Sequence, residues 1–460
     1  MRFYIDTRGC PKNTVDSEAL DQALRGAGHV PVDRAAAADV MIVNTCGFID
    51  VAKQESIDRL LELGQNKRPG QQLIAAGCLS QRYSDEVARD LPEVDTIVGI
   101  DAWRTLPALL AGVTEKPMGQ QDAPDVSQLG SLLRFPASLP VLNQWPATSR
   151  RGHSPSAYIK ISEGCNYGCT FCAIPIMKGL YRSKPLERIV EEARQLAASG
   201  VKEIILVSQD STAYGLDRRD DTSLPLLLEA LATQAPEIPW VRVMYIHPDR
   251  LTTKMIDRIA QVPTFCPYID IPMQHAHPDV LKRMRRGHLI ARTEELIERF
   301  RERIPGAAVR TTFMVGFPGE SSAEFDFLLD WLQRMRFDRA GVFTYSPEEG
   351  TPGAEMEQQV PERTRRRRRQ RLMEAQEVIS GQLQATLVGK TLDVLIEGTQ
   401  ERAPSTRHHG TVGLVSVGRS HRDAPEVDGT VLVRGRHRIG TMLKVRVRES
   451  TTHDLVGEAV

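Results

Sequence analysis

Three cysteines stand close together in Gly164-Cys165-Asn-Tyr-Gly-Cys169-Thr-Phe-Cys172, directly after a predicted strand. Thiolates are the preferred ligands of iron-sulfur clusters, and a compact loop with glycines lets three of them turn toward one 4Fe-4S unit. Three protein ligands leave one iron open, as a metal centre needs when it must bind a small molecule. A zinc loop that borrows a fourth ligand, or a set of surface thiols, is the alternative, and the spacing and placement favour the cluster.

A second set of three cysteines is spread over the first 80 residues. Cys10, Cys46 and Cys78 each stand beside a glycine at a predicted strand-to-helix turn. Taken singly, each is best explained as a buried thiol. Taken together, they follow neighbouring parallel strands, whose carboxyl ends meet at one sheet edge, so we expect a second three-thiolate cluster with an open iron. Cys266 has no such pattern and is predicted to be structural.

The composition is that of an ordinary globular protein. The 460 residues are 41% hydrophobic and 26% charged, which allows two to four domains. Because 59 Lys and Arg balance 59 Asp and Glu, the net charge identifies no partner. The first residues resemble no secretory signal, and no run of about 18 apolar residues occurs. Together with the odd number of cysteines, this predicts a cytoplasmic protein whose thiols bind metal or take part in catalysis rather than form disulfides.

The elements that must position these cysteines follow from the hydrophobic pattern. Residues 1–115 alternate β-like and helix-like stretches, which predicts a Rossmann-like parallel α/β domain. Its predicted strands are 3–7, 40–45, 72–76 and 96–100, and its predicted helices are 16–25 and 52–63. Residues 116–150 hold five prolines and little periodicity, which predicts a linker.

A second alternating region covers residues 151–380. Six β/α units predict a partial (β/α)6 barrel of the TIM type. The predicted strands are 157–162, 203–208, 241–246, 268–271, 308–315 and 340–345. Residues 382–460 instead show short alternating strands, which predicts a small all-β barrel. Its predicted strands are 392–396, 411–417, 431–433 and 442–447.

Seven arginines occur in the nine residues from Arg363 to Arg371. Such a run is compatible with a nucleic-acid contact. The favoured interpretation is a solvated connecting helix, because Glu355, Glu357 and Glu362 stand nearby to balance the charge.

The Cys165 motif, its place after the first strand and the six β/α units resemble the radical S-adenosylmethionine (SAM) enzymes. The resemblance implies that SAM binds the open iron and is cleaved to a 5'-deoxyadenosyl radical, which removes hydrogen from an unactivated carbon. It also implies that Phe171 packs against the adenine. Gly316-Phe-Pro-Gly319-Glu320 resembles the adenine-side glycine-rich segment of that family, with a plain strand-to-helix connection as the alternative.

Across essentially the whole chain, the two cysteine sets and the C-terminal module resemble the methylthiotransferases, whose last domain is a TRAM barrel. The branch that modifies a ribosomal protein is more similar than the tRNA-modifying branch, which more often has Gln-Met-Asn after its first cysteine. Arg8 and Met273 depart from the usual residues without touching a proposed ligand. The similar segments are Gly9-Cys-Pro-Lys-Asn13, Val15-Asp-Ser-Glu18, Asn44-Thr-Cys-Gly-Phe-Ile49, Ala52-Lys-Gln-Glu-Ser-Ile-Asp58, Asp270-Ile-Pro-Met-Gln-His-Ala276 and Gly418-Arg-Ser-His-Arg-Asp-Ala-Pro-Glu-Val-Asp-Gly429.

This branch implies transfer of a methylthio group to the β-carbon of an aspartate in small-subunit ribosomal protein twelve, free or within the ribosomal subunit. One SAM would supply the methyl group and a second the radical, with the early cysteines holding the auxiliary cluster. An electron donor such as flavodoxin, a monomeric state and the absence of a membrane partner are further implications.

Two other functions remain as alternatives: a tRNA adenosine methylthiotransferase with the same cofactors, and a zinc-stabilised RNA-binding module without catalysis. From Gln382 onward eleven Lys and Arg face nine Asp and Glu, which favours a protein substrate over a tRNA backbone. Gln274, His275 and His277 are candidates for the substrate side of the barrel, with buried structural histidines as the alternative.

Overall fold

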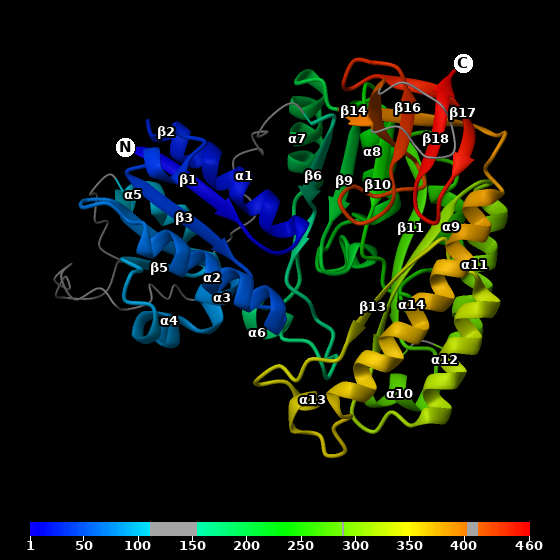
Figure 1. The fold of residues 1–460 in the computed structure, drawn as a ribbon, viewed down its shortest axis with the longest axis horizontal. Helices are drawn as coiled ribbons and strands as arrows, with labels where there is room; N and C mark the ends of the chain where they lie inside the picture. The colour runs from blue at the N-terminus through cyan, green and yellow to red at the C-terminus, as the bar shows by residue number, and fades with distance from the viewer. Residues whose placement is uncertain (111–153, 288, 403–412) are drawn as a thin grey trace.

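The computed structural model describes residues 1–110, 154–287, 289–402 and 413–460. These residues form a five-stranded sheet, a six-stranded sheet and a closed five-stranded barrel, together with a short two-stranded ribbon (Figure 1). The predicted linker, residues 116–150, lies outside the described residues. Within the described ranges no helix combines the length and the apolar character needed to cross a membrane.

The N-terminal unit is a parallel sheet with the strand order β2-β1-β3-β4-β5. Its β3 is buried along its whole length, as expected of a parallel strand covered on both faces. The four predicted strands are confirmed, except that β5 ends at Val98 and the two-residue edge strand β2 was not predicted. The elements are β1 (Arg2–Thr7), α1 (Pro11–Gly26), β2 (Val30–Pro31), β3 (Val40–Thr45), α2 (Asp50–Gln65), β4 (Gln72–Gly77), α3 (Cys78–Arg82), α4 (Ser84–Asp90), β5 (Thr96–Val98) and α5 (Leu106–Leu110).

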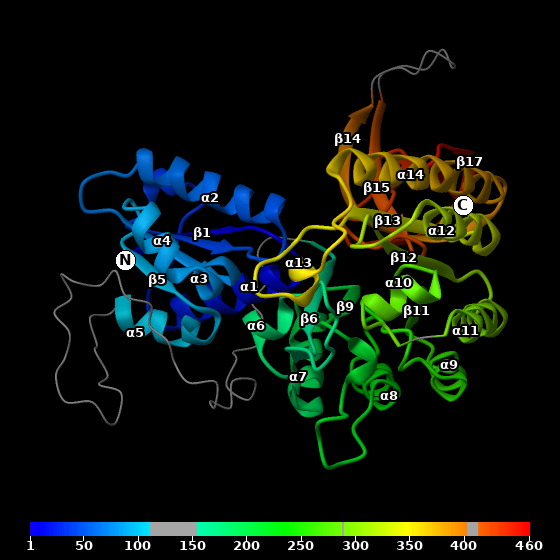
Figure 2. The same ribbon diagram turned by 90° about the horizontal axis from the view of Figure 1, so that it is seen from below.

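The central unit is a curved sheet with the order β13-β12-β11-β10-β9-β6, in which every neighbouring pair is parallel. Helices cover its outer face (Figure 2). All six predicted strands are present, which confirms the partial barrel. The elements are β6 (Ser156–Lys160), β7 (Ser162–Glu163), α6 (Ile174–Lys178), β8 (Arg182–Ser183), α7 (Leu186–Ala198), β9 (Glu203–Val207), α8 (Leu224–Gln234), β10 (Trp240–Val243), α9 (Thr253–Ile259), β11 (Phe265–Gln274), α10 (Pro278–Arg283), α11 (Ile290–Arg303), β12 (Ala308–Val315), α12 (Ser322–Met335), β13 (Arg339–Thr344), α13 (Pro352–Glu355) and α14 (Glu362–Ala385).

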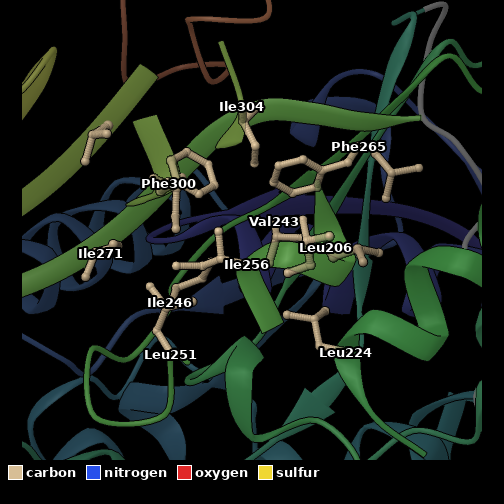
Figure 3. Close-up of a cluster of buried hydrophobic side chains, with 14 of the residues drawn as sticks. Leu206, Leu224, Val243, Ile246, Leu251, Ile256, Phe265, Ile271, Phe300 and Ile304 are labelled. Carbon is tan, nitrogen blue, oxygen red and sulfur yellow. The ribbon is translucent and has the colours of Figure 1, made fainter. Parts of the chain in front are cut away.

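The largest core lies between this sheet and its outer helices (Figure 3). Alternate residues of each strand face the helices, as the two-residue period of a strand requires, and Leu206 and Val243 are examples. Phe300 of α11 meets Phe265 of β11 edge to face, with ring centroids 6.4 Å apart. This layer fixes the strands in register, so their carboxyl ends share one rim.

The C-terminal unit is a closed barrel with the order β14-β15-β16-β18-β17. Closure removes the unpaired strand edges that a small open sheet would expose. Three of the four predicted strands are confirmed, residues 411–412 of the fourth lie outside the described ranges, and β18 was not predicted. The strands are β14 (Thr391–Arg402), β15 (Gly413–Ser420), β16 (Val431–Arg434), β17 (Met442–Ser450) and β18 (Leu455–Ala459).

The end of β15 and the segment that follows it cover the inner face of the central sheet at its amino end. Arg419 binds the buried Glu203 of β9, which also accepts a bond from Arg242 at 2.8 Å. Tyr268 donates to Asp428 at 2.6 Å. Cys266 is fully buried here and points at the carbonyl of His421, as expected of a structural thiol. Because the amino end is filled, the site must lie at the carboxyl end of the strands.

The arginine run lies on α14, and two of its side chains contact β13 and the loop after β12. Arg368 is buried and donates to Glu320, while Arg369 donates to the carbonyl of Val342 at 3.0 Å. Arg366 pairs with Glu362, and Arg371 pairs with Asp326. These contacts support the interpretation as a connecting helix rather than a nucleic-acid contact.

Candidate functional site: two cysteine trios

The first trio, Cys165, Cys169 and Cys172, lies on the loop after β7. The loop is shaped by Gly164, whose φ is +77° and whose position leaves no room for a Cβ, because the carbonyl oxygen of Leu180 would lie 2.2 Å away. The amide of Cys165 donates to Gly179 at 3.1 Å, and that of Cys172 donates to the carbonyl of Cys169 at 3.1 Å. The backbone therefore folds the three thiols toward one side.

The three thiols lie close enough to affect one another. Burial, with Cys169 and Cys165 adding to it, raises the pKa of Cys172 to about 12. Burial also raises the pKa of Cys165. The guanidinium of Arg286 lies 3.9 Å from the sulfur of Cys169, measured from Nη1, and opposes both shifts. A cation at this place favours bound thiolates.

A stacked pair adjoins this trio at the carboxyl end of the central sheet. The rings of Tyr167 and His247 are nearly parallel, with centroids 3.8 Å apart. Arg286 Nη1 donates to Nε2 of His247 at 2.6 Å, and Arg250 lies over the other ring with its Cζ 5.1 Å from the centroid of Tyr167. This arrangement offers cations and aromatic faces to a ligand beside the thiols.

The second trio gathers at the carboxyl edge of the N-terminal sheet, as predicted. Cys10 precedes α1, Cys46 follows β3 and Cys78 begins α3. The loops touch through glycines. A Cβ on Gly9 would lie 3.0 Å from the sulfur of Cys46, and one on Gly47 would lie 2.8 Å from the carbonyl oxygen of Cys78.

The thiols of this second trio also affect one another. Burial, with smaller contributions from Cys78 and Cys10, raises the pKa of Cys46 to about 12. Burial likewise raises the pKa of Cys78, which the nearby Lys178 opposes. Lys178 is therefore the cation near the second trio, as Arg286 is the cation near the first.

The donor sets suit an iron-sulfur cluster better than a single ion. A zinc ion binds thiolate sulfurs at about 2.3 Å in a tetrahedron. The sulfur atoms that bind one zinc ion therefore lie less than about 4 Å from one another. Among the described residues, the only group of three metal-ligating atoms within 4.8 Å of one another is His277, Asp279 and Glu324, which contains no cysteine. Each trio is therefore spaced too widely for one ion, while three soft donors around a shared space fit a cluster.

A cluster of four buried charged side chains connects the N-terminal unit with the central unit near the two trios. Lys160 of β6 binds Asp16 of α1 and lies 2.6 Å from Glu163. Lys178 Nζ lies 3.2 Å from Glu163 and 3.5 Å from Asp16. Burial works against the charge of Lys178, but Glu163, Cys78 and Asp16 hold its pKa well above the ordinary value. Asp16 comes from the N-terminal unit and the other three from the central unit.

Two further contacts bring the units together. Cys78 packs in one apolar cluster with Ala173, the residue after Cys172, and with Met177. On the other side, Glu348 accepts from Lys53 at 3.0 Å and from Arg82 at 2.9 Å. The second trio therefore lies beside the first, at the mouth of the partial barrel.

The residues predicted for the adenine side lie at the same end of the sheet. Phe171 is partly buried against Phe317 and Tyr345. Gly316 has a φ of +77° and lies against the side chain of Arg365, which a Cβ would meet at 2.1 Å. Glu320 turns back into its own loop and accepts from the amide of Phe317 at 3.1 Å. Burial raises the pKa of Glu320 to about 7, against the opposing effect of Arg368.

Gly319 also has a positive φ, of +74°, and its amide donates to the carbonyl of Gln358 at 2.9 Å. The loop from Gly316 to Glu320 is thus a tight turn held by its own backbone. That geometry fits the plain strand-to-helix connection as well as it fits an adenine contact.

The candidate substrate residues behave differently from one another. His275 is fully buried, its Nδ1 accepts from the amide of His277 at 2.9 Å, and burial lowers its pKa to about 3. His277 is partly exposed and begins α10, and Gln274 has a φ of +68° at the end of β11. The structure therefore supports the buried alternative for His275.

Several site residues escaped the sequence analysis. Lys178, Arg286 and His247 lie beside the trios but stand in no motif of their own. Lys12 is the exception, because it follows Cys10 by two residues, and that adjacency was the available signal. Long-range neighbours of this kind depend on the tertiary fold.

Comparison with known proteins matches all three units. Residues 159–332 match the radical SAM superfamily, residues 388–460 match the TRAM domain, and residues 2–99 match the uncharacterized protein family UPF0004. Membership of the radical SAM superfamily implies a 4Fe-4S cluster and SAM.

Solved structures support the fold. The radical SAM methyltransferase TsrM from Kitasatospora setae, with cobalamin and a [4Fe-4S] cluster bound, superposes with a TM-score of 0.55 at 14% identity. The match covers 88% of this chain and 81% of that chain. The radical SAM enzyme OxsB matches with a TM-score of 0.51 at 12% identity, over 82% of this chain and 56% of that chain. Likenesses at such low identity concern the fold alone.

Relatives of the same length are far more similar. Ribosomal protein uS12 methylthiotransferase RimO of Herpetosiphon aurantiacus is 42% identical over the full length of both chains. The protein of the same name from Chloroflexus aurantiacus is 43% identical, again over the full length of both. With its radical SAM unit, its TRAM barrel and this end-to-end similarity, the chain belongs to the RimO family of radical SAM methylthiotransferases.

Proposed function

We propose that this chain transfers a methylthio group to the β-carbon of an aspartate of ribosomal protein uS12. The observation that carries the proposal is the meeting of two cysteine trios at the mouth of one partial barrel, in a chain whose full-length relatives are named for that substrate. A carbon next to a carboxylate carries no good leaving group, so its substitution calls for removal of hydrogen by a radical.

Two clusters follow from the proposal. Cys165, Cys169 and Cys172 would hold the radical SAM cluster, and Cys10, Cys46 and Cys78 would hold an auxiliary cluster. When bound, these groups and SAM supply the radical, the sulfur and the methyl group.

The chain's own residues then have three tasks. Arg286 and Lys178 place a cation beside each trio. Asp16, Lys160, Glu163 and Lys178 fix the N-terminal unit on the central unit, so the spacing of the trios is set. The C-terminal barrel fills the amino end of the sheet and leaves the carboxyl end to the substrate. A fixed geometry of this kind lowers the entropy cost of bringing reactants together.

The use of charge favours a protein substrate over tRNA. Arg419 and Arg422 of the C-terminal barrel are bound to Glu203 and Asp338 of the central unit. They are therefore not available to phosphates, and a barrel that tracks a nucleic-acid backbone needs free cations.

We place the enzyme in the cytoplasm as a monomer that receives electrons from a donor such as flavodoxin.

The test compares a strain that lacks this protein with its parent. Mass spectrometry of ribosomal protein uS12 and of tRNA nucleosides is carried out on both strains. The proposal expects the methylthio mass to disappear from uS12 while tRNA methylthioadenosine stays unchanged. Loss of the tRNA modification with uS12 unchanged would contradict the proposal and support the tRNA alternative.

A further inference from the structure

Lys12 reaches from the N-terminal unit into the mouth of the partial barrel. It lies on the first turn of α1, two residues after Cys10. Its Nζ donates to the carbonyl of Ser208 at 3.2 Å, and it lies 3.7 Å from the ring centroid of Tyr245. Ser208 follows β9 and Tyr245 follows β10, so the ammonium group lies over the carboxyl ends of two central strands.

Within the described part of the chain, no Asp or Glu side chain lies within ion-pair distance of the Lys12 ammonium group, and Glu163 acts on its charge only from farther away. The neighbouring Lys160 and Lys178 differ, since both pair with Asp16 and Glu163. An ammonium group carries three N–H donors, and the carbonyl of Ser208 uses one of them. Donors and charge therefore remain for a ligand.

The support beneath Lys12 is held in a strained conformation. Tyr245 has a φ of +61°, which a bulky aromatic residue rarely adopts. Its amide donates to the buried Asp270 at 3.1 Å, which holds the backbone in place. Strain that the surroundings maintain in this way is concentrated at functional sites. Here it keeps an aromatic face under the cation.

The surroundings of Lys12 specify the ligand. Cys10 of the second trio lies on the same helix start, and two residues after Ser208 comes Asp210, one of the charges that act on Cys165 of the first trio. Lys12 thus lies beside the second trio and contacts the strand end from which Asp210 acts on the first. In a site shielded from water, a lysine ammonium binds carboxylates through short, charge-assisted hydrogen bonds.

We propose that Lys12 binds the side-chain carboxylate of the substrate aspartate and so places the adjacent β-carbon between the two cysteine trios. This inference rests on the proposed function and adds the residue that recognises the substrate side chain. It makes Lys12 a specificity-determining residue, which distinguishes an aspartate from an uncharged side chain of the same shape.

The experiment measures binding and turnover on the reconstituted full-length enzyme. Two fluorescent peptides of uS12 sequence are compared, one with the target aspartate and one with asparagine in its place. The variants are Lys12→Met and Lys12→Arg, and the control is Lys254→Met, which changes an exposed lysine on α9. Iron and sulfide are measured in every sample.

The wild-type enzyme and the Lys254→Met control are expected to bind the aspartate peptide at least about tenfold more tightly than the asparagine peptide. Lys12→Met is expected to bind both peptides equally and to methylthiolate the aspartate peptide with a kcat/KM reduced by about a hundredfold. Lys12→Arg keeps the charge and is expected to retain part of the preference. A general structural role of Lys12 would weaken both peptides alike and leave their ratio unchanged.

Two results would overturn the inference alone. One is a wild-type enzyme that modifies uS12 but binds both peptides equally. This result does not depend on whether any variant folds. The other is a Lys12→Met enzyme that retains the wild-type preference. Failure of the wild-type enzyme to modify uS12 at all, with tRNA modified instead, would overturn the proposed function and the inference with it.

Discussion

The two cysteine trios offer the same donors but are built in opposite ways. The first lies within eight residues of one loop, and its shape depends on the close contact of Gly164 with Leu180. The second joins three strand ends that are 68 residues apart from first to last, Cys10 to Cys78. A local loop can be recognised from its spacing, whereas a site assembled by a sheet requires the sheet to be correct first. The comparison separates ligand chemistry from ligand placement.

The largest expected effect comes from removing one ligand of each trio. Cys169→Ala is expected to abolish the reductive cleavage of SAM and, with it, methylthio transfer. Cys46→Ala is expected to abolish transfer while SAM cleavage continues, because the proposed function gives the two clusters different tasks. Both activities are measured by the release of 5'-deoxyadenosine and the mass of the product. Equal SAM cleavage by the two variants would show that the assignment of roles is wrong.

A second pair of substitutions tests placement without touching a ligand. Gly164→Ala and Gly77→Ala each introduce a Cβ at a positive φ, of +77° and +102°, and against carbonyl oxygens at 2.2 and 2.6 Å. Each variant is expected to lose one cluster, which is about four of about eight irons. Iron and sulfide analysis with SAM cleavage identifies which cluster is lost. Gly26→Ala, at a helix end with open space around it, is the control.

The substitution Asp16→Asn tests the buried charge cluster that connects the N-terminal unit with the central unit. Two buried ammonium groups, Lys160 and Lys178, would then share only Glu163. Removal of one partner from a buried ion group costs about 3 kcal/mol in the free energy of unfolding. We expect a lower thermal midpoint and a reduced ratio of methylthio product to 5'-deoxyadenosine, since the clusters lose their fixed spacing. An unchanged product ratio would mean that Asp16 does not set that spacing.

The last prediction concerns stability rather than activity and tests the contact between the C-terminal barrel and the central sheet. Burial opposes the charge of Glu203, but Arg419 and Arg242 outweigh it and lower its pKa from 4.5 to about 2. Stability from a lowered carboxyl pKa is present above pH 4.5 and is lost as the pH falls toward 2. It amounts to about 3 kcal/mol, and Glu203→Gln should remove this part of the acid dependence. Denaturant unfolding from pH 7 to pH 3 measures it, and an unchanged slope in the variant would contradict the assignment.

Much of the fold follows from the sequence because its signals are local. Apolar runs such as Val40–Thr45 mark buried parallel strands, and all six central strands were predicted within a few residues. The misses have physical reasons. The strand β2 has only two residues, and β18 (Leu455–Ala459) carries Gly457 and Glu458, which weaken its alternating pattern.

The site was predictable only in part. Cysteine spacing predicted the first trio, and glycine-flanked cysteines at the ends of neighbouring parallel strands predicted the second. The structure brings the second trio to one sheet edge, and the role of both trios as cluster ligands stays a prediction. Lys178 and Arg286 are far in sequence from Cys78 and Cys169, the cysteines beside which they lie. Lys12 follows Cys10 by two residues, but its contacts with Ser208 and Tyr245 depend on the tertiary fold. His275 is one of the predicted substrate candidates, yet the fold buries it completely, as the alternative for it expected. Burial and long-range pairing are properties of the packed chain.

The most direct test of the two-trio account is the metal content of anaerobically reconstituted protein. Iron, acid-labile sulfide and zinc are measured in the wild type and in two variants that replace one whole trio each by alanine. The account predicts about eight irons and eight sulfides per wild-type chain, about four of each in either variant, and no zinc. A wild-type chain with four irons, or with zinc in place of sulfide, would contradict it.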